Sequence, residues 1–197
     1  EKERYLYNLA ASYAWLGEAE RSQMNYPKAM AYYDQAITIC EEHYLVGGTA
    51  TFYTYAGQAA LDSGDLTAAE RYLSLGVRQF NAVELMWGRG VAFGYYGLLC
   101  VKRGNYQMAF DYLTKAECFS QRLESCYEQG MLNRIYASIV LDMDTIPKLR
   151  FIFGGYLDQK AEVYVRRARK LLREVYSPVE QMYLDEIERT IQSTKGQ

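Results

Sequence analysis

Apolar and small residues recur at helical spacing along most of this chain, and one stretch of the pattern is repeated at intervals of forty residues. The three copies are NYPKAMAYYDQA (Asn25–Ala36), DLTAAERYLSLG (Asp65–Gly76) and NYQMAFDYLTKA (Asn105–Ala116). Successive apolar or small positions within each copy are three, four and three residues apart, which places them on one face of a helix. Each copy begins with Asn or Asp, whose side-chain oxygen can accept a hydrogen bond from the first free amides of a helix. We therefore predict an amphipathic helix at each copy.

Glycines at matching positions predict a partner helix upstream of each copy. Gly17, Gly57 and Gly97 recur at the same interval of forty. A glycine inside a helix costs about 1 kcal/mol relative to alanine, so we expect each one to permit the close approach of two helices. Gly64 and Gly104 stand directly before the second and third copies, where a glycine can take the left-handed conformation that ends a helix. Each unit is therefore predicted to be a helix, a tight turn and a second helix.

A fourth copy is present but less regular. TIPKLRFIF, residues 145–153, repeats the opening of the first copy, with Thr145 at the cap position and a proline in the same place. Leu149 replaces the usual alanine, and two glycines directly after this stretch are expected to stop the helix early. This copy is therefore predicted to form a hairpin that packs differently from the other three.

The C-terminal segment departs from the repeat. Residues 157–176 are predicted to form a further helix. Ser177, Pro178 and Glu180 together make a capping box, which marks the start of another helix. We divide the chain into four helical hairpins over 1–157 (about 3–43, 46–81, 83–120 and 121–157) and a helical cap over 158–197.

The helical pairs resemble tetratricopeptide repeats. The stretch FGYYGLLCVKRGNYQMAFDYLTKA, Phe93–Ala116, fits that family's arrangement of small and large residues around a G-[DN]-[YL]-x-x-A turn. The second and third copies match best, the first lacks the turn glycine, and the fourth lacks the alanine. The period exceeds the usual spacing of about 34 residues, as in the long-period repeats of bacterial signalling ATPases and transcription regulators. The resemblance covers about residues 5–156 and implies an all-α, right-handed solenoid.

The resemblance also implies that binding residues lie on the first helix of each pair, which lines a concave groove in that family. Carried over to this chain, the groove residues are Glu18, Arg21, Thr54, Gln58, Asp62, Leu98, Lys102, Arg134 and Ser138. Trp15, Tyr55 and Tyr95 recur at intervals of forty on or near the same face. These rings can grip a peptide, a partner helix or a sugar, and the ordinary alternative is that each ring packs against the next repeat. The clamp of Lys, Asn and Arg with which chaperone-binding members hold a peptide carboxylate is absent.

A second candidate surface is basic. It comprises Arg166, Arg167, Arg169, Lys170 and Arg173. Charge of this density can contact phosphates or an acidic partner. Helical spacing places most of these residues on one side of a helix, so a solvated helix face is the ordinary alternative.

Composition narrows the class of function. With 22 Lys and Arg against 24 Asp and Glu, the net charge of −2 gives no long-range attraction to nucleic acid or to a membrane. The sole histidine, His43, argues against histidine-based metal and catalytic sites, and the four cysteines lie in apolar helical patterns without a C-x-x-C pair. We expect buried, reduced cysteines, a cytoplasmic location, no metal, no cofactor and no catalytic activity.

These observations predict a non-catalytic scaffold that binds a protein or peptide, or else a small effector. The chain begins inside a periodic segment without a starting Met, so we expect it to be the sensor or interaction domain of a larger bacterial transcription or signalling regulator. We expect no membrane association and no direct binding to nucleic acid. Two alternatives stay open: a module for homo-oligomerisation, such as a homodimer, and a regulator similar to peptide-controlled phosphatases.

Overall fold

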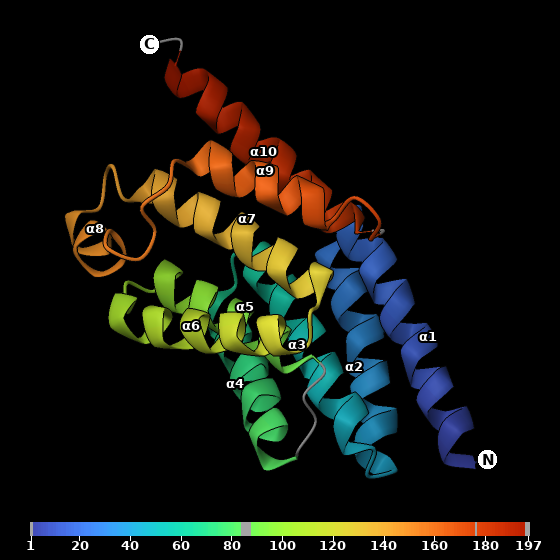
Figure 1. Cartoon of the computed structure of the whole chain (residues 1–197). Helices are drawn as coiled ribbons and strands as arrows, with labels where there is room; N and C mark the ends of the chain where they lie inside the picture. The colour runs from blue at the N-terminus through green and yellow to red at the C-terminus, as the bar shows by residue number, and fades with distance from the viewer. Residues whose placement is uncertain (1, 84–87, 176, 196–197) are drawn as a thin grey trace.

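The computed structural model describes residues 2–83, 88–175 and 177–195, and this part of the chain contains ten α-helices and no strand (Figure 1). The helices are α1 (Lys2–Ser22), α2 (Tyr26–Glu42), α3 (Val46–Asp62), α4 (Leu66–Ala82), α5 (Arg89–Lys102), α6 (Tyr106–Arg122), α7 (Cys126–Asp142), α8 (Pro147–Phe153), α9 (Ala161–Leu171) and α10 (Pro178–Lys195). The all-α prediction is confirmed. Residues 84–87 of the predicted third hairpin, and residues 1, 176, 196 and 197, lie outside the described part.

Neighbouring helices pack in antiparallel pairs. The pairs are α1 with α2, α3 with α4, α5 with α6, and α7 with α9 (Figure 1). The second helix of each of the first three pairs also contacts the first helix of the next pair. In addition, the first helices α1, α3, α5 and α7 contact one another in sequence. They therefore form a continuous row, which we call the first-helix row.

The glycines of the first-helix row lie where the paired helices approach most closely. A Cβ atom on Gly57 would come within 2.5 Å of the Leu73 side chain and 3.1 Å of its backbone nitrogen. A Cβ atom on Gly17 would come within 2.5 Å of the Tyr33 side chain, and one on Gly97 within 2.7 Å of the Leu113 side chain. Contacts this short leave no room for a Cβ unless the neighbouring helix shifts. The predicted reason for the repeated glycines, close helix contact, is confirmed.

The tight turns form as predicted at the second and third pairs. Gly64 and Gly104 adopt left-handed conformations with φ of 82° and 76°. The first pair lacks a glycine at this position and places Met24 there instead, with φ of 60°. A residue with a side chain is strained in this region of φ, so the first turn is intrinsically less favourable than the other two.

Only one of the three predicted caps uses its side chain. Asn25, Asp65 and Asn105 all occupy the N-cap position of the second helix in their pairs. Asp65 accepts hydrogen bonds from the Thr67 and Ala68 amides at 3.1 and 2.9 Å. Neither asparagine makes a side-chain cap bond, so the expectation of side-chain capping was wrong for these two.

The fourth repeat differs from the expected hairpin. The helix α8 begins at Pro147, with Ile146 rather than Thr145 at its cap, and it has only seven residues. Its Phe153 ring packs edge-on against Phe110 of α6 at 5.5 Å. A helix of two turns is too short to cover α7, and α9 lies along α7 instead, where the Leu172 side chain meets Gly130. The segment around α8 is therefore inserted between the two members of the last pair.

The cysteines are only partly buried. Cys40 and Cys100 are buried, and burial raises the pKa of each thiol to about 11. Cys118 and Cys126 are exposed, which corrects the expectation that all four lie in the core. Cys118 lies on the exposed face of α6, and Cys126 is the exposed first residue of α7.

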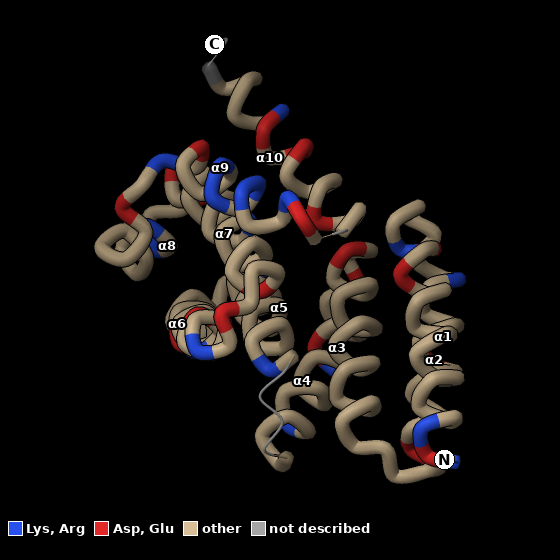
Figure 2. Tube along the Cα trace, turned by 45° about the vertical axis from the view of Figure 1, so that its right-hand side comes forward, with Lys and Arg blue, Asp and Glu red and all other residues tan. Residues whose placement is uncertain are grey.

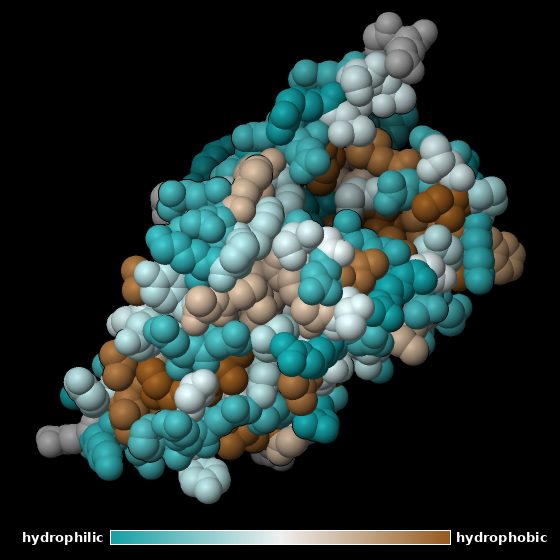
Figure 3. Space-filling view, turned by 180° about the vertical axis from the view of Figure 1, so that it is seen from behind, coloured by the Kyte–Doolittle hydropathy of each residue, from teal (hydrophilic) through white to brown (hydrophobic). Residues whose placement is uncertain are grey.

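Seen from behind, the surface is mostly hydrophilic, and apolar side chains interrupt it near the N-terminal end and around the opposite end that carries α8 (Figure 3). The most exposed large apolar residues include Phe151 of α8, at 89% exposure, and Tyr44 in the turn after α2, at 88%. None of the described helices is both long enough and apolar enough to cross a membrane.

Candidate functional site

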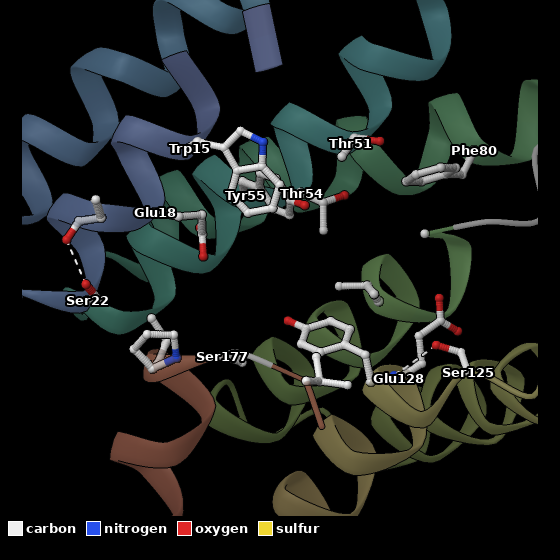
Figure 4. A pocket seen from close by; sticks show the side chains of 17 residues that line it. Trp15, Glu18, Ser22, Thr51, Thr54, Tyr55, Phe80, Ser125, Glu128 and Ser177 are labelled. Carbon is white, nitrogen blue, oxygen red and sulfur yellow. Dashed lines mark hydrogen bonds between the residues drawn. The ribbon is translucent and has the colours of Figure 1, made fainter. Parts of the chain in front are cut away.

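A pocket of about 560 Å³ lies on the first-helix row, beside the start of α10 (Figure 4). Its walls come from the first helices of all four pairs, the end of α4 and the segment that leads into α10. It is lined by Trp15, Glu18, Ala19, Ser22, Thr51, Thr54, Tyr55, Phe80, Gly88, Val91, Ser125, Tyr127, Glu128, Val175, Ser177, Pro178 and Val179. This volume falls in the range of small-molecule sites, roughly 300–1,000 Å³.

Aromatic rings form much of the pocket wall. Trp15 lies at the mouth and is 69% exposed. The Tyr55 ring packs against the rings of Tyr33 and Phe52, with centroid distances of 6.2 and 6.3 Å. Burial raises the pKa of the Tyr55 hydroxyl to about 12, so this group stays protonated at neutral pH and serves as a hydrogen-bond donor or acceptor. Rigid aromatic side chains provide a large contact area at little cost in conformational entropy. The pocket is therefore suited to a mostly apolar ligand.

The charged groups of the pocket are all acidic. Among the lining residues that the structure describes there is no Lys, Arg or His, and the two ionisable carboxylates are Glu18 and Glu128. Figure 4 shows these two side chains on opposite sides of the pocket. Glu18 accepts a hydrogen bond from the Tyr33 hydroxyl and lies 3.4 Å from the Arg21 guanidinium. Its charge is therefore already compensated within the protein.

Glu128 lacks such compensation. It stands in the first turn of α7, which Ser125 caps by accepting a hydrogen bond from the Glu128 amide at 3.2 Å. The residue is only 2% exposed, and its Oε2 atom has no hydrogen-bond partner in the described part of the chain. Gly90 makes room for this carboxylate, because a Cβ there would lie 2.2 Å from Oε2.

The environment of Glu128 changes its proton affinity. Burial raises the pKa of its carboxyl from the ordinary 4.5 to about 7, and a hydrogen bond from the Gly88 backbone opposes the rise. Taking a carboxylate out of water without an opposite charge disfavours the ionised form. The pocket wall thus contains a carboxyl that changes its charge near neutral pH.

The helix α10 covers another part of the first-helix row, where it buries a second glutamate. Glu180 is fully buried and accepts hydrogen bonds from Tyr95 Oη at 2.7 Å, Arg134 Nε at 2.9 Å and Arg134 Nη2 at 3.2 Å. Although burial alone raises the pKa of this carboxyl, the charge and hydrogen bonds of Arg134 lower it overall. The Arg134 guanidinium also lies 4.7 Å from the centre of the Tyr183 ring. The predicted role of Glu180 in a capping box was wrong, because its side chain points to α5 and α7.

Arg21 connects this covered region to the pocket. Its guanidinium is buried and donates a hydrogen bond to Gln58 Oε1 at 2.8 Å. The same group lies 3.5 Å from Asp62 and, as noted, 3.4 Å from Glu18 in the pocket wall. Arg21 therefore joins Glu18 in the pocket wall to Gln58 and Asp62 of α3.

The structure divides the sequence-predicted groove residues into three groups. Four of them line the pocket, namely Trp15, Glu18, Thr54 and Tyr55. Five lie beneath or beside α10, namely Arg21, Gln58, Asp62, Tyr95 and Arg134. The remaining three, Leu98, Lys102 and Ser138, belong to neither group. Leu98 is buried in the core, Lys102 is exposed, and Ser138 donates a hydrogen bond to the Ile135 carbonyl.

Four parts of the pocket wall were not predicted from the sequence: Glu128, Tyr127, Phe80 and the segment 177–179. Glu128 had a detectable signal: at the same place in the repeat, the two preceding copies have Gly48 and Gly88. An acidic side chain that replaces a repeated glycine is a departure from the packing pattern. The segment 177–179 had no such signal, because only the folded chain brings it to the first-helix row.

The basic segment lies on α9 and is partly neutralised by α10 (Figure 2). Arg169 forms ion pairs with Asp185 and with Glu188, the latter at 2.9 Å, and it also hydrogen-bonds Gln181. The Arg167 guanidinium lies 5.7 Å from the centre of the Tyr164 ring. The other three basic residues, Arg166, Lys170 and Arg173, are exposed.

In the described ranges no cluster of three or more His, Cys, Asp and Glu side chains has a geometry that could hold a metal ion. Comparison with known proteins gives no match, whether to a protein-family model, to a curated protein or to a solved structure.

Proposed function

We propose that this protein is a non-catalytic binding module, built as a right-handed solenoid of tetratricopeptide-like hairpins, and that its pocket binds a small effector. The observation that carries the proposal is the position of the pocket, which is lined by the first helices of successive pairs. In a stack of such pairs, each unit contacts only its neighbours, and the first helices together form a concave surface. A pocket at this place draws its walls from several units.

A small molecule fits the pocket better than an extended peptide does. The part of the first-helix row that holds Arg21, Gln58 and Arg134 is covered by α10, so a peptide cannot run along the whole row. What stays open is the pocket of about 560 Å³, which is mainly apolar and contains a few polar groups. This combination is typical of small-molecule sites.

The connection to α10 supports a role as a sensor. Ser177, Pro178 and Val179 line the pocket, and Glu180, the next residue, is fixed to α5 and α7. A ligand in the pocket therefore touches the start of the same helix that covers the rest of the row. Binding shifts the position of α10 if the ligand favours one placement of that helix over another.

A thermal-shift screen with a library of small apolar compounds tests this function. The expected result is that some compounds raise Tm, because binding to the native state alone stabilises it. Ala19→Trp provides the specific test, since Ala19 is an exposed residue of the pocket wall and a large ring there fills the mouth. The Tm shifts should disappear in this variant and persist in the matched control Ala31→Trp, on the exposed face of α2.

Two results would contradict the proposal. One is a library in which no compound raises Tm, and the other is a set of ligands that bind Ala19→Trp as well as they bind the unchanged protein. Hydrogen exchange of α10 tests the sensor role separately: a ligand of the pocket should alter the protection of its amides.

A further inference from the structure

The Glu128 carboxylate carries a charge that is not matched by a neighbouring group among the described residues. Its Oε2 atom is buried and has no partner in the described part of the chain, although buried charges in proteins are as a rule paired and hydrogen-bonded. Figure 4 shows the carboxylate among the side chains of the pocket wall. Because Glu128 lines the pocket, a ligand bound there can supply a partner for its carboxylate.

In the part of the chain that the structure describes, no Lys, Arg or His lines the pocket to supply this partner. Arg89 is close in sequence to Gly90, which touches the carboxylate, but its Nη2 donates hydrogen bonds to the carbonyls of Phe80 and Val83. Its guanidinium also lies 5.1 Å from the centre of the Phe119 ring. The charged lining residues that the structure describes are both carboxylates, and of the two only Glu18 has an internal counterion, Arg21.

The chemistry of the wall decides which ligands fit. An anionic ligand would meet two carboxylates and no positive group, so it is disfavoured. A neutral apolar ligand would fill the space but would leave Glu128 unmatched. A ligand with one positive group and an apolar body satisfies both features, because the rings of Trp15, Tyr55 and Tyr127 attract cations as well as apolar groups.

We propose that the effector is a small organic cation, a protonated amine carried on an apolar body, and that its ammonium group pairs with the Glu128 carboxylate. The proposal rests on the proposed function and specifies the ligand class of the same pocket. Glu128 rather than Glu18 is the partner, because Glu18 is already engaged by Tyr33 and Arg21. The apolar body lies along the aromatic wall towards the mouth at Trp15.

Isothermal titration calorimetry with matched probes tests the ligand class. Hexylamine and phenethylamine carry the positive group, 1-hexanol and 2-phenylethanol are their neutral counterparts, and hexanoate is the anionic one. The expected result at pH 7.5 is that each amine binds at least tenfold more tightly than its alcohol and than hexanoate. Equal affinities, or tighter binding of the alcohol or of hexanoate, would overturn the proposal while leaving the proposed function intact.

Variants identify the carboxylate. Glu128→Gln keeps the size of the side chain and removes its charge, so the preference for amine over alcohol should fall by at least tenfold. Glu124→Gln is the matched control, since Glu124 is exposed in the turn before α7 and outside the pocket, and it should keep the full preference. Circular dichroism of both variants checks that they fold. An amine preference that survives in folded Glu128→Gln overturns the assignment of the partner.

A further titration distinguishes a free small amine from the ammonium group of a lysine side chain in a peptide. A short peptide with a central lysine and blocked ends presents the same ammonium group on a macromolecular ligand. We expect it to bind at least tenfold more weakly than hexylamine, because α10 covers the rest of the row. A lysine peptide that binds more tightly than the free amines would overturn the small-molecule proposal. If neither these probes nor the wider library bind, the proposed function itself fails.

Discussion

Two glutamates buried against the first-helix row differ in what surrounds them. Glu180 of α10 receives three hydrogen bonds from Tyr95 and Arg134, and the net effect is a lowered pKa. Glu128 of α7 has one oxygen without a partner, and burial raises its pKa to about 7. The first is part of a closed structural contact, whereas the second is left open towards a pocket. In the described part of the chain, one face of the helical stack thus holds both a fully paired buried glutamate and a buried glutamate with an unpaired oxygen.

The difference follows from what covers each carboxylate. A buried ion pair with complete hydrogen bonding contributes little net stability, but it is strongly destabilising to break. A buried carboxylate without a partner lowers stability for as long as it stays ionised, and natural proteins retain such groups mainly at functional sites. Substitutions at the two glutamates and their neighbours distinguish a structural role from a binding role.

The largest effect is expected from breaking the closed contact. Arg134→Met leaves Glu180 buried without its cation and should lower the free energy of unfolding by about 3–5 kcal/mol. Urea denaturation followed by circular dichroism measures this loss. The double variant Arg134→Met with Glu180→Leu removes both charges and should recover most of it. A single variant as stable as the original protein would show that α10 is not fixed by this pair.

Removing the charge of Glu128 should raise the stability of the protein, whereas removing that of Arg134 lowers it. The native pKa of Glu128 is about 7 and its ordinary value is 4.5, so the native state holds its proton where the unfolded state has released it. The contribution of Glu128 to the free energy of unfolding therefore falls as the pH rises from about 4.5 to 7, and it stays reduced above that range. At pH 8, Glu128→Gln should raise the free energy of unfolding by about 1–3 kcal/mol, and at pH 4 it should change little.

Urea titrations of the two proteins at both pH values measure this difference. Among the described residues, the Gly88 backbone donates a hydrogen bond to the Glu128 carboxyl and Gly90 of α5 lies against it. A Glu128→Gln variant that is less stable than the original protein at pH 8 would place Glu128 with Glu180 among the structural residues.

A smaller effect is expected where the helices of one pair approach each other. Gly57→Ala places a Cβ against Leu73, including its backbone nitrogen, and should lower stability by about 1–2 kcal/mol even though alanine is the better helix former. Gly155→Ala is the control, because nothing lies within 4 Å of a Cβ there. The same denaturation assay compares them. A Gly57→Ala variant more stable than the original would contradict the close contact.

The smallest effect is expected at the outer contact between α9 and α10. Arg169 forms partly exposed ion pairs with Asp185 and Glu188, and exposed pairs contribute about 0–1 kcal/mol. Arg169→Gln should therefore cost less than about 1 kcal/mol, and the difference should shrink in high salt. A loss as large as that of Arg134→Met would mean that α10 is fixed from outside rather than by Glu180.

The sequence was sufficient to predict the helices of the first three pairs, because each position of the pattern serves one local contact. Gly57 against Leu73, the left-handed Gly64 and the cap at Asp65 all lie within a few turns of one another. Such short-range geometry follows from spacing alone. The early stop of the fourth copy was predicted as well, since α8 ends at Phe153 before the two glycines, but the pairing of α7 with α9 was not.

The candidate site was predicted only in part, because its remaining features depend on long-range placement. Glu180 has a local interpretation as a cap, and only its approach to Arg134, 46 residues away in the chain, replaces that interpretation. Similarly, the aromatic column separates in the folded chain: Trp15 and Tyr55 line the pocket, whereas Tyr95 binds Glu180. Periodicity places residues on a face, but it does not show which part of that face a distant helix covers.

The division of the first-helix row is tested most directly by measuring stability and ligand affinity on the same samples of the original protein and Glu128→Gln at pH 8. The account predicts opposite changes: the variant unfolds at higher urea concentration and binds hexylamine at least tenfold more weakly. A variant that loses stability, or that binds hexylamine as tightly as the original protein, would contradict it.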